Sequence, residues 1–338
     1  MTIDSSSEPP KEPFNGPPLN GPPKSNRPVA VGDVLATGWR LYRSHFSQYA
    51  AIALKANLWM FVPLMLISLI GALFAQGAES VSAYRGVLAL LVPSAVVLFI
   101  LSFAQFLGLT AGISRLAYQT LSEGHETAPD TLRFTLSRKY SLLWQNVLRG
   151  LIFMAVYILL LFFAVVFIVV VISEAETSST LPTVVALLAV GGMIASIFCF
   201  IWLALRMMLA DQPLAIEPES SATKAIGRSW RLTKGSVMRS LLVAITVYFI
   251  AVPITFILYV ASQIIVYRLF SLSSVPAPGT APLALADMVP VLAGAGISVL
   301  GSLAGSVITT PLWHTMLTAL YFNLRNRQSA QPTPRQLS

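Results

Sequence analysis

The chain is 338 residues long, 55% of its residues are hydrophobic, 11% are charged, and its formal net charge is +8. Soluble domains carry about 25% charged residues, so this chain lacks the polar surface that an ordinary water-soluble fold needs. The single cysteine, Cys199, excludes an intrachain disulfide and a cysteine-cluster metal site.

The chain opens with a proline-rich segment at residues 1–28. Eight prolines fall there, and proline fixes its own backbone and lacks an N–H donor. We expect this segment to be a disordered cytoplasmic tail. The membrane domain is expected to occupy residues 29–327, and residues 328–338 are expected to form a second disordered tail.

Six long apolar stretches follow the tail. They contain no Asp, Glu, Lys or Arg, and they cover residues 56–78, 86–114, 150–173, 177–205, 240–267 and 288–324. A helix needs roughly 20 apolar residues to cross the hydrocarbon core. Unbroken runs such as LIFMAVYILLLFFAVVFIVVV favour helices over barrel strands. The sequence therefore predicts an all-α polytopic bundle with six spans, at about 56–76, 87–110, 150–172, 182–205, 240–263 and 289–312.

The positive charges alternate between the connections. The odd-numbered gaps, counted from the N-terminal tail, hold 20 of the 22 Lys and Arg residues, and the opposite side holds only Arg85 and Arg268. Positively charged connections remain on the cytoplasmic side. We expect both termini to be cytoplasmic, and the net charge to reflect topology rather than nucleic-acid binding.

A basic amphipathic segment precedes the first, third and fifth spans. When the sequences of these segments are aligned, Trp39, Phe134 and Trp230 fall at the same position, with offsets of 95 and 96 residues. This period predicts three parallel repeats, each an interfacial helix followed by two spans. Their expected bounds are about 30–122, 129–212 and 219–325.

The cations of these segments form a predicted surface that we call the basic collar. Its residues are Arg40, Arg43, Arg138, Lys139, Lys224, Arg228, Arg231 and Lys234. In the third segment the four cations fall on one helical face, and Ala222, Ile226 and Trp230 fall on another. In the first segment the expected apolar stripe is Leu35, Trp39, Tyr42 and Phe46. Two interpretations stay open: the helices anchor and orient the bundle, or they bind lipid headgroups or a partner, with Trp39, Phe134 and Trp230 at the interface.

Small and hydroxyl-bearing residues recur in the second and sixth spans. Small residues let helices approach closely in lipid, and we assign helix packing to Gly108, Gly112, Gly294, Ser298, Gly301, Ser302 and Gly305. Ser302, Thr309 and His314 are the residues of a candidate polar path. A proton-coupled transporter usually needs a buried carboxylate, and the spans contain none.

Catalytic motifs are missing from the chain. It has no phosphate-binding glycine loop, no HExxH and no GxSxG. We therefore expect no enzymatic activity, no cofactor and no metal site.

Residues 205–243 carry a resemblance to a known family. This stretch leaves a span through Arg206, passes the acidic turn at Glu217 and Pro218, and enters the basic segment RSWRLTKG at 228–235. It resembles the membrane domain of the glycerophosphoryl diester phosphodiesterase membrane-domain family, as does the ending LYFNLRNR at 320–327. The resemblance implies a multi-pass protein of the bacterial cytoplasmic (inner) membrane. It does not imply phosphodiesterase activity, because the chain has no catalytic barrel.

Two functions are compatible with these features. The first is a non-enzymatic membrane module that engages anionic lipid or protein partners through the basic collar. The second is a transporter or channel for a lipidic or weakly polar substrate. The concentration of charge in the collar favours the first.

Overall fold

The computed structural model describes residues 30–75, 85–174, 180–272 and 288–329, and within these ranges the chain is helical and contains no strand. The expected all-α fold is therefore confirmed. The N-terminal tail and residues 330–338 lie outside the described residues. The C-terminal tail was expected to begin at residue 328, but the last helix continues to Ser329.

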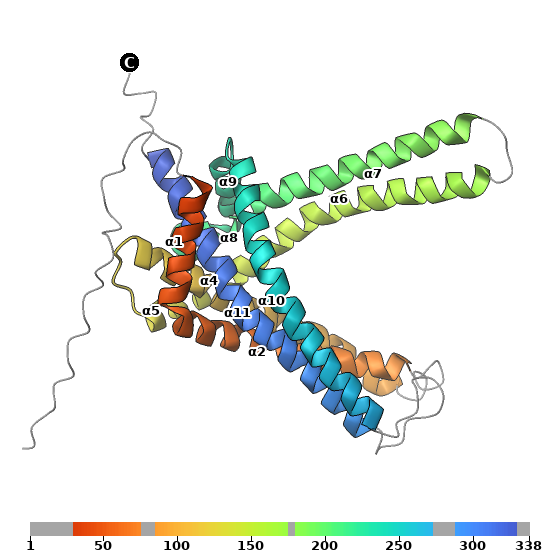
Figure 1. The fold of residues 1–338 in the computed structure, drawn as a ribbon, viewed down its shortest axis with the longest axis horizontal. Helices are drawn as coiled ribbons and strands as arrows, with labels where there is room; N and C mark the ends of the chain where they lie inside the picture. Colours follow the sequence, from red (N-terminus) through yellow and green to blue (C-terminus); the bar gives the residue numbers. More distant parts are fainter. Residues whose placement is uncertain (1–29, 76–84, 175–179, 273–287, 330–338) are drawn as a thin grey trace, which may run out of the picture.

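Six long helices form three antiparallel hairpins (Figure 1). The pairs are α2 (Phe46–Ala75) with α4 (Arg85–Leu121), α6 (Lys139–Glu174) with α7 (Thr180–Met207), and α10 (Val237–Leu272) with α11 (Met288–Ser329). Each is long and apolar enough to cross a membrane. In lipid such a segment must satisfy its own backbone groups, which a helix does.

Four short helices lie together at one end of the hairpins, which we call the short-helix end (Figure 1). They are α1 (Val31–Ser44), α5 (Ala128–Ser137), α8 (Asp211–Ile216) and α9 (Ala222–Leu232). The first, second and fourth each precede a hairpin, in the expected order. The sequence did not predict α8, which has five consecutive buried residues, from Gln212 to Ile216.

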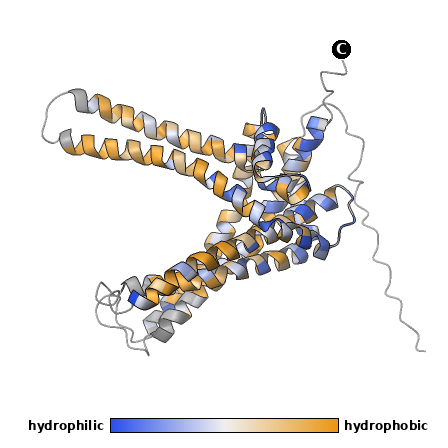
Figure 2. Ribbon diagram, turned by 180° about the vertical axis from the view of Figure 1, so that it is seen from behind, coloured by the Kyte–Doolittle hydropathy of each residue, from blue (hydrophilic) through white to orange (hydrophobic). Residues whose placement is uncertain are grey.

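The hairpins are not packed equally. Helix α11 lies against α2 and α4, whereas the α6–α7 hairpin diverges from them and contacts the rest near the short-helix end (Figure 1). No residue in the most apolar window of α6 is buried within the protein. Figure 2 shows apolar residues along all three hairpins and polar residues gathered at the short-helix end.

The largest group of buried apolar residues also lies at the short-helix end. Its members include Val34 of α1, Leu214 of α8, and Leu320 and Tyr321 of α11. These residues join elements that are far apart in the sequence. The hydrophobic core therefore holds the short helices and the bases of the hairpins together.

The buried faces of α1 and α9 differ from the expected stripes. In α1 the inward face is Val34, Gly38, Leu41 and Tyr42, while Trp39 is 42% exposed. In α9 the inward residues are Ala222, Ala225, Ser229 and Leu232. The two tryptophans of these helices, Trp39 and Trp230, are therefore left at the surface.

Candidate functional site

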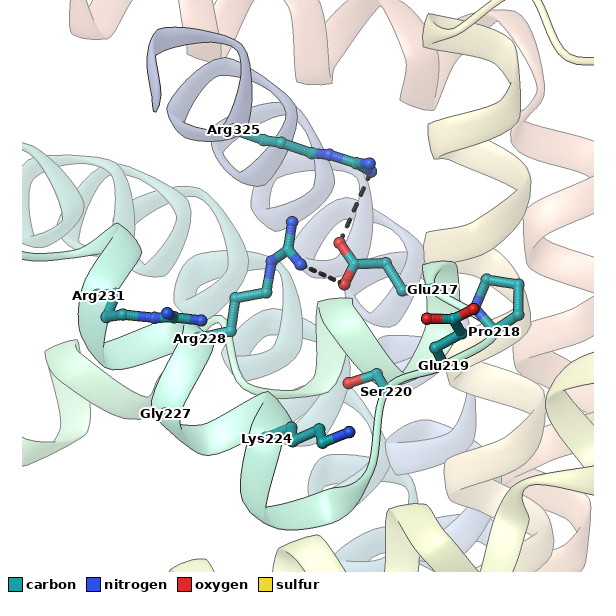
Figure 3. A pocket seen from close by; sticks show the side chains of 9 residues that line it. All are labelled: Glu217, Pro218, Glu219, Ser220, Lys224, Gly227, Arg228, Arg231 and Arg325. Carbon is teal, nitrogen blue, oxygen red and sulfur yellow. Dashed lines mark ion pairs between the residues drawn. The ribbon is translucent and has the colours of Figure 1, made fainter. Parts of the chain in front are cut away.

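A cavity of about 700 Å³ opens at the short-helix end, between α9 and the segment that precedes it. Figure 3 shows its lining, which comes from the α8–α9 connection, from α9 and from the end of α11. The lining residues are Glu217, Pro218, Glu219, Ser220, Lys224, Gly227, Arg228, Arg231 and Arg325. Four are cationic and two are acidic, which leaves a net formal charge of +2.

Helix α9 presents one cationic face to this pocket. Lys224, Arg228 and Arg231 are spaced by four and three residues, so they share one side of the helix. Ala225 and Ser229 point away from them into the protein and are buried. Lys234, the fourth cation of the predicted face, is exposed and does not line the pocket.

Glu217 is the acidic centre of the pocket. Its Oε2 lies 2.7 Å from Nη1 of Arg228, and its Oε1 lies 3.7 Å from Nη1 of Arg325 (Figure 3). The hydroxyl of Tyr321 also donates to Oε1, at 2.6 Å. These contacts join the end of α8 to α9 and α11.

Arg138 fixes the backbone that forms one edge of the pocket. Its guanidinium donates to the carbonyl oxygens of Leu214 at 3.1 Å, Glu217 at 2.6 Å and Ser220 at 2.8 Å, and also to that of Pro218. Burial lowers the pKa of Arg138 from its ordinary value. This collar residue is therefore engaged by the protein itself.

A second arginine, the buried Arg115, completes the support of α8. The Arg115 side chain donates to the carbonyl oxygens of Ala215 at 3.2 Å and Ile216 at 3.1 Å. It also binds both carboxylate oxygens of Glu126 and lies 3.7 Å from the ring centroid of Phe134. A cation near the C-terminus of a helix satisfies orphan carbonyls and stabilises the helix dipole.

Arg115, Glu217 and Arg325 were not among the predicted site residues. The signal for Arg115 was an arginine directly after a charge-free stretch, with a glutamate in the following connection. The hydrogen bonds from Arg115 hold the pKa of Glu126 below its usual range.

The other collar residues are distributed over the short-helix end. Arg40 and Arg43 of α1 are exposed, as are Lys224 and Arg231 of α9. Lys139 is half-buried at the start of α6, with Nζ 5.2 Å from the ring of Tyr140. The structure therefore places the eight collar residues at one end but brings only Lys224, Arg228 and Arg231 into one pocket.

The three aligned aromatic residues have different surroundings. Trp230 is 37% exposed and packs edge-to-face on Trp202, with Arg206 5.0 Å from the Trp230 ring centroid. Trp39 is exposed and stacks on Tyr42. Phe134 instead lies under Arg115, so its position is set by a protein contact.

The predicted packing glycines lie at close helix contacts. A Cβ at Gly112 would lie 2.6 Å from the Leu132 side chain, and one at Gly108 would lie 3.0 Å from Leu136. A Cβ at Gly301 would lie 2.6 Å from Ser262. The remaining positions of this group lie on α11: Gly294 is buried, Gly305 faces Thr255, the Ser298 hydroxyl accepts from Gln263, and Ser302 is exposed.

The residues of the candidate polar path make separate contacts. Ser302 and Thr309 donate to the carbonyls of Ser298 and Gly305, four residues earlier in the same helix. His314 Nδ1 lies 2.9 Å from the Ser114 hydroxyl, which also accepts from Gln212. The contacts of His314 and Gln212 with Ser114 join α4, α8 and α11, and the polar path stays a prediction.

The six apolar helices define this chain as an integral multi-pass membrane protein. No family model, curated protein or solved structure matches it. The resemblance to the glycerophosphoryl diester phosphodiesterase membrane-domain family therefore stays a prediction, as do the three repeats. The two stretches that carry the resemblance, 205–243 and 320–327, meet at Glu217, where Arg228 and Arg325 both contact its carboxylate.

Proposed function

We propose that this protein is a non-enzymatic membrane module that engages anionic lipid headgroups through the basic collar, with the short-helix end on the cytoplasmic side. One observation carries the proposal: five collar cations are exposed together at the short-helix end. They are Arg40, Arg43, Lys224, Arg231 and Lys234. A Lys or Arg near an anionic membrane surface contributes about 1 kcal/mol of attraction.

The surrounding aromatic residues support the same placement. Trp202 and Trp230 pack on each other where α7 meets α9, and the Arg206 guanidinium lies over both rings. Tryptophan is enriched at the boundary between lipid and water. This cluster favours a position of α9 in the headgroup layer, where its cations reach lipid phosphates.

Lipid enrichment around the full-length protein tests the proposal. The protein is reconstituted into nanodiscs of equal parts phosphatidylglycerol and phosphatidylcholine, and the lipids retained after mild delipidation are measured by mass spectrometry. We expect enrichment of phosphatidylglycerol that falls with rising salt. Replacing the five exposed cations with Gln is expected to abolish most of that enrichment.

A control variant removes the two positive charges at the opposite end. Arg85 and Arg268 are exposed there, and Arg85→Gln with Arg268→Gln is expected to leave the enrichment unchanged. If the five-residue variant retains the enrichment of the wild type, the lipid proposal is wrong, and an acidic protein partner becomes the remaining candidate for this surface.

A further inference from the structure

We propose that the pocket lined by Lys224, Arg228 and Arg231 binds a single phosphate group, as a monoester or a diester. This inference rests on the proposed function, because it names the ligand chemistry of one part of the basic collar. It goes further in one respect: it expects a saturable site, whereas a charged surface alone attracts lipids without a fixed number of sites.

The charges of the pocket fit a phosphate. Glu217 neutralises part of the positive charge through Arg228 and Arg325, but the lining still carries +2. Lys224 and Arg231 are exposed, and among the described residues neither takes part in an ion pair. Arginine binds phosphate with two parallel hydrogen bonds and lysine binds it as a point charge.

The start of α9 borders the pocket. Lys224 extends from the first turn towards Ser220 (Figure 3). Ser221 occupies the N-cap position, but its side chain makes no capping hydrogen bond. The first-turn N–H groups therefore lack this cap, and the N-terminus of a helix attracts anions.

Gly227 is the second observation that points to a ligand. It lines the pocket between Lys224 and Arg231, in the interior of α9. Glycine destabilises a helix interior relative to alanine, and a Cβ built here meets no atom within 4 Å. Protein packing therefore does not require glycine at this position. A ligand that approaches the helix backbone gives a reason for the missing side chain.

Calorimetric titration of the full-length protein in a neutral detergent tests the inference. The probes are dioctanoyl phosphatidic acid and inorganic phosphate, and the control is dioctanoylglycerol, which has the same acyl chains but no phosphate. We expect saturable binding of about one equivalent of a phosphate probe. If inorganic phosphate competes with phosphatidic acid, the pocket recognises the phosphate group itself. If phosphatidic acid binds and inorganic phosphate does not, the pocket recognises a lipid headgroup. Absence of saturable binding by both anionic probes overturns the inference.

One double variant and a control that removes the same charge locate the binding. Lys224→Gln with Arg231→Gln is expected to weaken phosphate binding about tenfold or more, which corresponds to the loss of one or more charge-assisted hydrogen bonds. Arg85→Gln with Arg268→Gln removes the same charge from exposed residues outside the basic collar, and it is expected to change the affinity by less than about threefold, because only long-range attraction is lost. Equal effects of the two pairs overturn the inference.

Gly227→Leu tests the shape of the pocket without changing its charge. We expect it to abolish phosphate binding while the melting temperature stays equal to that of the wild type or rises, because leucine favours a helix more than glycine does. An unchanged affinity overturns the inference.

The two proposals fail in different ways. In one outcome, the five-residue collar variant loses phosphatidylglycerol enrichment, but Lys224→Gln with Arg231→Gln binds phosphate as tightly as the control variant does. The pocket inference is then wrong and the proposed function stands. If enrichment and saturable phosphate binding are both absent from the wild type, both are wrong.

Discussion

Arg115 is the residue whose replacement should destabilise the short-helix end most. It is 7% exposed and joins α4 to the end of α8 and to Glu126. Arg115→Met keeps most of the side-chain volume but leaves the carbonyls of Ala215 and Ile216 without this donor. Each unsatisfied buried carbonyl costs about 1–3 kcal/mol. The Glu126 side chain is 32% exposed and regains water, so we expect a total loss of about 3 kcal/mol, the low end of the range for a broken buried pair.

Reversible unfolding in mixed detergent and SDS micelles, followed by circular dichroism, measures this loss. Arg133→Met on the exposed side of α5 is the matched control and is expected to stay within about 0.5 kcal/mol of the wild type. Arg115→Lys should fall between the two, since an ammonium cannot span the carboxylate and both carbonyls. If Arg115→Met unfolds as the control does, Arg115 does not support α8.

Three further predictions concern stability and topology. The hydrogen bonds from Arg115 lower the pKa of Glu126 from its ordinary value of 4.5, so its charge stabilises folding above about pH 4.5, and this contribution is lost as the pH falls through the lower pKa of the folded state. Glu126→Gln should therefore weaken the pH dependence of the melting temperature below about pH 4.5. A Cβ at Gly38 would lie 2.5 Å from a methionine sulfur of α11, and Gly38→Leu should cost about 1–3 kcal/mol in SDS unfolding, whereas Gly32→Ala, with nothing within 4 Å, should cost none. In a cysteine-free background, cysteines at Arg85 and His125 should react with impermeant reagents from opposite sides of the membrane, and labelling from one side would contradict the topology.

The six spans were predictable because each is a long stretch without charge. Their ends were not, because a helix does not stop where the apolar run stops. Helix α6 begins at Lys139, about ten residues before the expected start, since KYSLLWQNVLR continues the helix into the polar layer. The helix α8 gave no periodic signal, because six residues make less than two turns and Pro213 lies inside it.

The candidate site could be predicted in its residue types but not in its pairings. Spacing alone placed Lys224, Arg228 and Arg231 on one face of a helix, and the structure keeps them together. The partner of Arg228 is Glu217, across the α8–α9 turn, and Arg325 reaches the same carboxylate from the end of the chain. Such contacts depend on the tertiary fold, which periodicity does not describe.

The pairings divide the basic collar into cations that build the protein and cations that are free to bind. The Arg138 guanidinium donates hydrogen bonds to backbone carbonyls from Leu214 to Ser220. Removing this side chain would therefore disturb the edge of the pocket whether or not a ligand is bound. Arg228 forms an ion pair with Glu217 and lines the pocket, so it belongs both to the cations that build the protein and to those that are free to bind. Lys224 and Arg231 flank it on the same face and remain exposed. A test of ligand binding is therefore informative at Lys224 and Arg231, whereas loss of function at Arg138 would report on folding.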